Sequence, residues 1–64
     1  MNDIYSSSVV KDFFLTDVEV AQMLRVSVGL VRKWRLKKTG PPFKKLGRLV
    51  RYDRSAVVAW KDRQ

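Results

Sequence analysis

The tripeptide Gly40-Pro41-Pro42 most limits how this chain can fold, because neither proline can continue a helix and glycine readily ends one. Any helix before it must end by residue 40, and any later element must start anew. The chain has 64 residues, and a domain of about 60 residues buries only about 60% of the surface that its unfolded form exposes. We therefore expect one small domain with a thin core, divided at this tripeptide.

The stretch before the tripeptide begins with a helix start signal. Thr16 is followed three residues later by Glu19, and such a pair satisfies two backbone N–H groups at a helix N-terminus reciprocally. Leu15 precedes this cap and is expected to pack against Val20, which flanks the core face. The spacing predicts an amphipathic helix over residues 16–24. Its apolar positions are expected to face the core: Val18, Ala21 and Leu24. Its polar positions are expected to face water: Asp17, Glu19 and Gln22.

A second helical pattern follows after only three residues, Arg25 to Ser27. Ser27 is a good N-cap residue, and Val31 and Trp34 form an apolar face. These signals predict a helix over residues 28–36. Its opposite side is expected to carry the other side chains: Val28, Gly29, Arg32, Lys33 and Leu36. Two short helices joined by so few residues cross at a steep angle, as in a helix-turn-helix.

Two short β-prone runs follow the prolines, on either side of Gly47-Arg48, and predict a small hairpin over residues 43–52. Alternation along the second run sends its residues to two faces: Val50 and Tyr52 to the core, Leu49 and Arg51 away from it. Asp53 is expected to cap a last helix, whose apolar stripe is Ala56, Val57 and Trp60.

The predicted fold class is therefore α+β: a small winged helix-turn-helix with the order helix, turn, helix, two-stranded wing and C-terminal helix. It is expected to occupy residues 13–64. Residues 1–12 mix polar and scattered apolar side chains without a sustained period and are interpreted as a flexible N-terminal tail.

Charge is the strongest compositional signal, because 14 Lys and Arg stand against 6 Asp and Glu, a net charge of +8. Residues 1–24 hold one base and four acids, a net of −3, whereas residues 25–64 hold 13 bases and two acids, a net of +11. Only Asp53 and Asp62 could pair with bases inside that second part. A field this one-sided attracts polyanions, and nucleic acid is the first candidate.

The composition also excludes classes of function. The chain has no His and no Cys, so Ser/His or Cys/His catalysis, thiolate metal sites and disulfides are ruled out. No phosphate-cradling glycine-rich loop is present and the acids are scattered, so we expect neither an enzyme nor a bound cofactor or metal. No apolar run approaches the roughly 20 residues of a membrane span, and the first residues lack signal-peptide features. We expect a cytoplasmic, nucleoid-associated protein.

The candidate site combines the second helix with the hairpin. In such helix pairs the N-terminal half of the second helix meets base edges in the major groove. Arg32 or Lys33 could bond guanine O6 and N7, and Val28 or Leu30 could contact a thymine methyl. The wing cations and the linker lysines are expected on the sugar-phosphate backbone or in the minor groove: Lys44, Lys45, Arg48, Arg51, Lys37 and Lys38.

Several alternatives stay open. The missing side chain of Gly29 either lets backbone approach the DNA closely or has no role. A protein-interaction module would use the hairpin or the Val57 and Trp60 helix as a docking surface. RNA binding needs exposed aromatic side chains for stacking, and only Phe13, Phe14 and Phe43 lie outside core spacing.

Two stretches carry a family resemblance, FLTDVEVAQMLRVSVGLVRKW and GPPFKKLGRLVRYDRSAVVAW. Together they resemble the winged helix-turn-helix domain of small phage and prophage regulators, which include the AlpA-like proteins and the excisionases and are distant relatives of MerR-type DNA-binding domains. The resemblance covers residues 14–62. The segment Val28-Gly29-Leu30 departs from it, since relatives often carry polar side chains there.

The resemblance implies a mobile-element protein that binds double-stranded DNA. Members bend DNA as recombination directionality factors, or regulate an integrase promoter or other promoters. It therefore implies an integrase and cooperative self-association as partners, and we favour the directionality factor. It also implies that Thr16 bonds a phosphate, that Arg48 and Arg51 contact the backbone or minor groove, and that four side chains pack the core: Val31, Trp34, Tyr52 and Trp60. The full set of expected DNA contacts is Thr16, Ser27, Val28, Gly29, Leu30, Arg32, Lys33, Arg35, Lys37, Lys38, Lys44, Lys45, Arg48 and Arg51.

Overall fold

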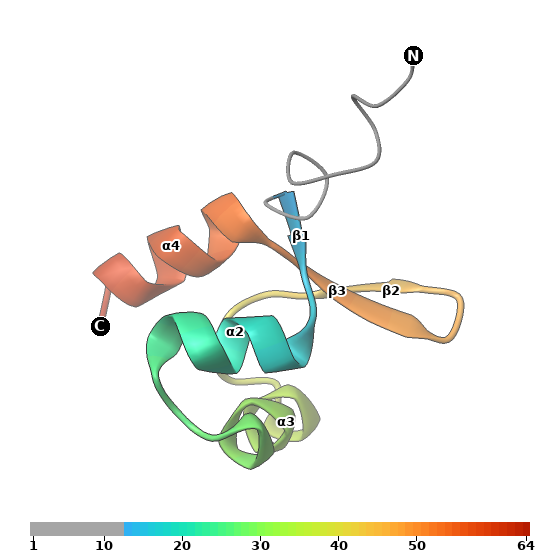
Figure 1. Ribbon diagram of the computed structural model, residues 1–64, viewed down its shortest axis with the longest axis horizontal. Coiled ribbons are helices and arrows are strands. Elements are labelled where there is room, and N and C mark those ends of the chain that lie inside the picture. Colours follow the sequence, from blue (N-terminus) through green and yellow to red (C-terminus); the bar gives the residue numbers. More distant parts are fainter. Residues whose placement is uncertain (1–12) are drawn as a thin grey trace.

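The computed structural model describes residues 13–64, and these form an α+β domain. In chain order the elements are β1 (Phe14–Leu15), α2 (Asp17–Leu24), α3 (Val28–Lys37), β2 (Lys44–Leu46), β3 (Leu49–Asp53) and α4 (Arg54–Asp62). The hairpin of β2 and β3 extends to one side of the molecule, α4 extends to the other, and α3 lies below α2 (Figure 1). The predicted order of helix, turn, helix, wing and helix is confirmed.

Both helices of the first pair begin where their capping residues predict. Thr16 Oγ1 accepts a hydrogen bond from the Glu19 N–H at 3.1 Å, and the Thr16 N–H donates to Glu19 Oε1 at 2.9 Å. Ser27 Oγ accepts a hydrogen bond from the Leu30 N–H at 3.1 Å. These bonds satisfy N–H groups that a helix itself leaves without partners. The two predicted helices are confirmed to within one residue at each end.

Arg25 forms the turn between α2 and α3 in a left-handed conformation, with φ 59°. Its backbone N–H donates to the carbonyl oxygens of Ala21 and Gln22, which closes the C-terminus of α2. A residue with a Cβ pays about 1–2 kcal/mol for this conformation, and glycine avoids that cost. Arg25 therefore occupies a position that the backbone would favour for glycine.

We expect Arg25→Gly to raise the free energy of unfolding by about 0.5–1 kcal/mol, because the relief of strain exceeds the entropy that glycine adds to the unfolded chain. Thermal unfolding followed by circular dichroism would show the midpoint rise by a few degrees. Arg25→Ala is the matched control, since it removes the same side chain but keeps the Cβ. An equal rise in both variants would show that the side chain, not the backbone angle, is responsible.

The sheet has three strands in the order β1-β3-β2, all antiparallel. β2 and β3 pair across the turn at Gly47-Arg48, with Lys45 opposite Val50, which confirms the predicted hairpin. On its other edge β3 pairs with β1, with Leu15 opposite Tyr52. The sequence predicts a two-stranded wing and misses β1, because a strand of two residues is too short to show alternation.

The core lies where α2, α3 and α4 meet the sheet. Its buried side chains come from five of the six elements: Leu15, Val20, Ala21, Val31, Tyr52 and Val57. Trp34 and Trp60 pack against each other with ring centroids 5.3 Å apart, which ties α3 to α4. Tyr52, Val31 and Val57 are almost completely buried, so the predicted core faces of α3, β3 and α4 are confirmed.

The predicted core face of α2 is wrong at Val18. This side chain is 44% exposed, whereas Val20, expected only to flank the core, is fully buried. Val20 and Ala21 lie at the centre of the buried stripe, and at about 100° per residue Val18 points well to one side of it. The apolar spacing fits more than one helix face, and the packing against α3 and the sheet selects one.

Two further expectations are wrong in part. Val28 is half-buried rather than lying on the outer side of α3, because the core cluster reaches the first turn of that helix and Val28 packs against it. Asp53 is the N-cap residue of α4, but its side chain makes no capping hydrogen bond, and its backbone pairs with Phe14 as the end of β3. The predicted tail, residues 1–12, lies outside the described residues.

Candidate nucleic-acid interface

The outer side of α3 carries a single stripe of exposed residues at spacings of three and four: Gly29, Arg32, Lys33 and Leu36. The side chain of Arg32 is 54% exposed and Leu36 is 84% exposed. Val31 on the opposite side is fully buried. The prediction that Arg32 and Lys33 point away from the core is therefore confirmed.

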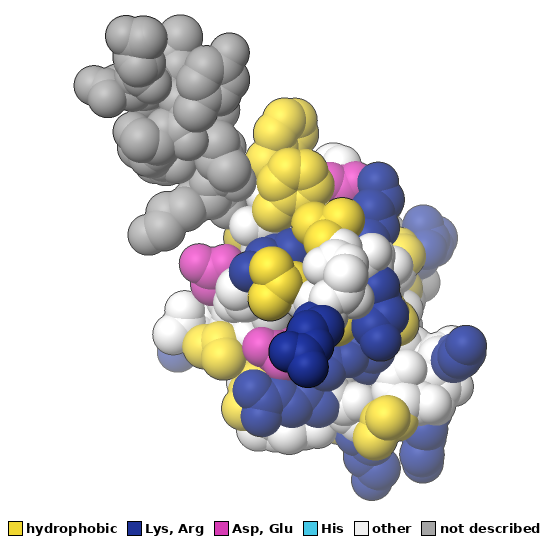
Figure 2. Space-filling model, turned by 90° about the vertical axis from the view of Figure 1, so that its right-hand side faces the viewer, with side chains coloured by type: hydrophobic (Ala, Val, Ile, Leu, Met, Phe, Trp, Pro, Cys, Tyr) yellow, Lys and Arg dark blue, Asp and Glu magenta, His cyan; other side chains and the backbone are white. Residues whose placement is uncertain are grey.

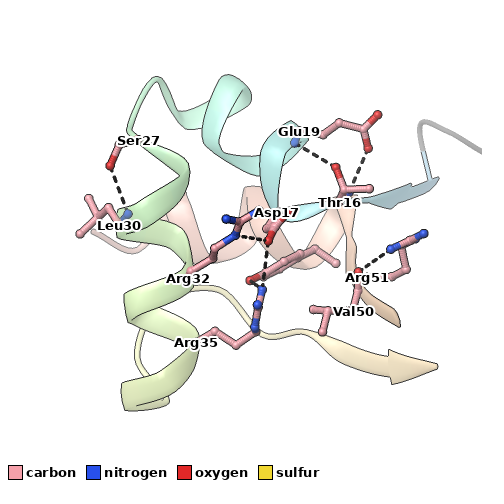
Figure 3. A network of polar contacts seen from close by, with 10 residues as sticks. Thr16, Asp17, Glu19, Ser27, Leu30, Arg32, Arg35, Val50 and Arg51 are labelled. Carbon is pink, nitrogen blue, oxygen red and sulfur yellow. Dashed lines mark hydrogen bonds and ion pairs between the residues drawn. The ribbon is translucent and has the colours of Figure 1, made fainter. Parts of the chain in front are cut away.

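Asp17, at the start of α2, lies against this face and binds two arginines of α3 (Figure 3). Its Oδ2 accepts a hydrogen bond from Arg32 Nε at 2.8 Å and lies 3.5 Å from Arg35 NH1. The expectation that Asp17 faces water is wrong, since its side chain is only 19% exposed. Asp17 was not among the acids expected to pair with these bases, because it lies outside residues 25–64 in the sequence. The packing of α2 brings it to α3 in the folded protein.

Arg35 is more enclosed than Arg32, with a side chain 23% exposed against 54%. Its NH1 donates to the Tyr52 hydroxyl at 3.5 Å, and its guanidinium lies 5.9 Å from the centre of the Phe43 ring. The hydrogen bond to Tyr52, opposed by partial burial, raises the pKa of Arg35 above its ordinary value. Arg35 therefore stays charged while it joins α3 to β3 and to the segment that leads into the wing.

The ion pairs of Asp17 have a consequence for acid stability. The hydrogen bond from Arg32 holds the pKa of Asp17 below its ordinary value of 3.8, against a smaller opposing effect of burial. A carboxyl whose pKa is lower in the folded protein adds stability above its unfolded pKa and loses it as the pH falls through the folded value. The contribution of Asp17 is thus complete at neutral pH, begins to fall near pH 4 and is lost as the pH drops through the lower folded pKa.

We expect Asp17→Asn to lower the free energy of unfolding at pH 7 by up to about 1 kcal/mol, the upper range for a pair open to solvent. The difference from wild type should vanish as the pH falls from 4 toward 2, when both side chains are neutral. Urea unfolding at pH 7, 4 and 2.5 measures it. A deficit that persisted undiminished at pH 2.5 would show that the loss does not come from the charge.

A basic groove of about 540 Å³ lies between α3 and the wing. Its lining includes four cations from both sides and no acid: Arg35, Lys38, Lys45 and Arg48. Leu36, Phe43 and Val50 complete the lining. Figure 2 views the domain from the hairpin end and shows Lys and Arg side chains spread over that face with few acidic ones among them. The groove thus lies between the two elements, α3 and the wing, that the sequence predicts to contact DNA together.

The four wing cations do not share one face. Lys44 lies opposite Arg51 in the hairpin register, and Lys45 lies opposite Val50, so the two pairs point to opposite faces of the hairpin. Lys45 lines the groove, whereas Lys44 lines a small hollow on the side of α4. Arg51 NH1 donates to the Val50 carbonyl oxygen at 2.8 Å. The structure thus brings Lys45 and Arg48 toward α3 and separates Lys44 and Arg51 from them.

The remaining predicted contacts lie at the ends of the helices. Thr16 and Ser27 both use their hydroxyl oxygens as acceptors in the helix caps, and each hydroxyl keeps a proton that it can donate. Leu30 is half-buried beside the cap of α3. Lys37 and Lys38 are exposed at the C-terminus of α3, where Lys38 adopts a left-handed conformation with φ 57°.

Three exposed leucines lie beside the predicted contacts but were not expected among them. Leu36 lies on the α3 stripe, one turn beyond Arg32 and Lys33. Leu46 and Leu49 face each other across the hairpin beside its turn and are 52% and 53% exposed. Their spacing could have revealed all three, since Leu36 continues the outer stripe and the other two flank Gly47-Arg48. Asp17 had no such signal, because its partners are 15 and 18 residues away.

A steep pair of short helices, followed by an antiparallel sheet whose hairpin stands beside the second helix, defines a winged helix-turn-helix. A family model described as a helix-turn-helix domain matches residues 14–64, and the chain belongs to this family. Membership indicates a DNA-binding domain. Among curated proteins, no relative matches the chain. Within residues 13–64, no helix is long and apolar enough to cross a membrane.

Proposed function

We propose that this protein binds double-stranded DNA with α3 in the major groove and the wing against the adjacent backbone or minor groove, as an excisionase-like recombination directionality factor that bends its site. The observation that carries the proposal is the groove between α3 and the wing, which four cations line without an acid. Cations on two facing elements suit a phosphate backbone that passes between them, and three of the four have no ion pair within residues 13–64: Lys38, Lys45 and Arg48.

Base reading falls to a short part of α3. Gly29 offers no side chain, Val28 is half-buried against the core, and Leu30 lies beside the cap, so the first turn provides few groups for base edges. Arg32 and Lys33 can bond guanine, and the exposed Leu36 suits a thymine methyl. Phosphate contacts and DNA shape then supply most of the binding free energy.

The other predicted residues serve the backbone in this proposal. Thr16 and Ser27 stand at helix N-termini, where a hydroxyl and the helix dipole favour a phosphate. Two exposed lysines at the end of α3, Lys37 and Lys38, extend the contact along the duplex. Lys44 and Arg51, on the outer face of the hairpin, add attraction to the duplex at longer range rather than a full phosphate contact each. Contacts on both sides of one groove favour a bent duplex, because bending brings more phosphates within reach.

Salt-dependent binding and footprinting test this proposal together. The logarithm of the association constant should fall with the logarithm of salt concentration by about 0.9 per phosphate contacted, and one site should be preferred over random DNA. Footprints on the DNA that flanks the gene should show tandem direct repeats near a recombination site, with bending visible in permuted fragments. Equal competition by random DNA at every salt concentration would refute sequence-specific binding.

A transcriptional role is the second candidate, because the same groove serves an AlpA-like regulator of an integrase or mobile-element promoter. A lone palindrome over a promoter in the footprint would favour it.

An integrase contact or cooperative self-association is proposed for the apolar surface outside the groove. Phe13 and Phe14 support this, since they are 59% and 41% exposed with ring centroids 5.7 Å apart. If this docking were the main role, Arg32→Ala with Arg48→Ala would leave function in vitro largely intact.

A further inference from the structure

Asp17 is the one acid that the structure places against the exposed stripe of α3 within residues 13–64. It holds Arg32 through a bond of 2.8 Å from Nε to Oδ2 and lies 3.5 Å from Arg35 NH1 (Figure 3). Arg35 is in turn fixed by the Tyr52 hydroxyl and the Phe43 ring. The carboxylate is therefore part of a network anchored in the sheet, and Arg32 is the member that reaches solvent.

The atom by which Arg32 is held matters. A guanidinium has five N–H donors, and its bond to Asp17 uses the single one on Nε. The two terminal nitrogens, the ones that bond O6 and N7 of a guanine together, remain available on a side chain that is 54% exposed. Asp17 thus restricts the rotamers of Arg32 without occupying its reading end.

The charge of Asp17 acts in the opposite direction on general affinity. A carboxylate beside a helix face that enters DNA repels phosphates and lowers the field that draws any duplex to the protein. A residue that weakens contacts with every sequence while it orients an arginine for one base increases the difference between the right and the wrong site.

We propose that Asp17 is a specificity-determining positioning residue, which presents the terminal nitrogens of Arg32 to one guanine of the target while it reduces binding to other sequences. The proposal rests on the proposed function, duplex binding through α3. It adds that discrimination at one base pair depends on an acid of the preceding helix.

Selection from a randomised duplex library tests this with wild type and three variants: Asp17→Ala, Arg32→Ala and Asp62→Ala. Asp62 is the matched control, since it is also an acid paired at 2.8 Å, with Lys61, but at the far end of α4. Each variant is used below its own unfolding midpoint, confirmed by circular dichroism. Affinities are then measured for the selected duplex, for the duplex with the one guanine pair exchanged, and for an unrelated duplex.

We expect Arg32→Ala to reduce the preference for that guanine pair about tenfold or more. Asp17→Ala should reduce it about fivefold at the same position while it raises affinity for the unrelated duplex several-fold. Asp62→Ala should leave the preference unchanged. Loss of stability alone would weaken all duplexes equally and would not produce this opposed pair of changes.

The outcomes separate this inference from the proposed function. A preference kept by Asp17→Ala at a position where Arg32→Ala loses it would overturn the role of Asp17 and leave duplex binding intact. A guanine preference unaffected by Arg32→Ala would also overturn it, because Arg32 would not be the reader. A wild-type protein that enriches no sequence would overturn both the inference and the sequence-specific part of the proposed function.

Discussion

Replacing Lys45 and Arg48 with alanine is expected to lower affinity for any duplex by about 100-fold at 0.1 M salt, on the order of tenfold for each charge-assisted phosphate contact. Both side chains line the groove between α3 and the wing, where no acid competes for them. The loss of two phosphate contacts should also reduce the slope of log affinity against log salt by about 1.8. Fluorescence anisotropy with a labelled duplex over a salt series measures both quantities.

The hairpin provides its own control for this result. Lys44→Ala with Arg51→Ala removes the same charge from the same two strands, but on the opposite face. We expect this second double variant to lose less than tenfold in affinity and to keep most of the slope. Equal losses in the two double variants would show that net charge, rather than the groove, determines binding.

Gly40→Ala is expected to lower the free energy of unfolding by about 3 kcal/mol, more than a methyl group added at either of the other two glycines. Gly40 has φ +78°, and an added Cβ would lie 2.8 Å from the Trp34 Cβ. That atom is one bond from the backbone of α3, and the Trp34 ring packs on Trp60, so neither can move aside cheaply. At about 4–8 °C per kcal/mol for a small domain, the unfolding midpoint should fall by more than about 10 °C.

Gly47→Ala separates the two causes of this loss. Gly47 has a similar angle, φ +66°, but nothing lies within 4 Å of an added Cβ. It should therefore lose only the conformational cost of about 1 kcal/mol. If the two variants lost the same stability by thermal unfolding, the contact with Trp34 would have no energetic weight, and the tight turn after α3 would depend on backbone angle alone.

Local chemistry made much of this fold predictable. The pair Thr16 and Glu19, and Ser27 after it, mark the helix starts because capping bonds join residues only three apart. Gly47-Arg48 marks the hairpin, and alternation along β3 assigns Val50 and Tyr52 to the core side. Such signals need no knowledge of distant residues, so the order of elements and the basic wing follow from the sequence.

The sequence also predicts a helix-turn-helix with a wing over residues 13–64 and places its positive charge in residues 25–64, but it does not show how those charges are used. The crossing of α2 over α3 brings Asp17 to Arg32, turns Val18 outward and half-buries Val28. Backbone pairing adds β1 to the sheet and sends Lys45 and Lys44 to different faces. These outcomes depend on the angle and register at which separate elements meet, and spacing along the chain carries no information on either. The tertiary structure alone decided which cations are free for a partner and which an acid already holds.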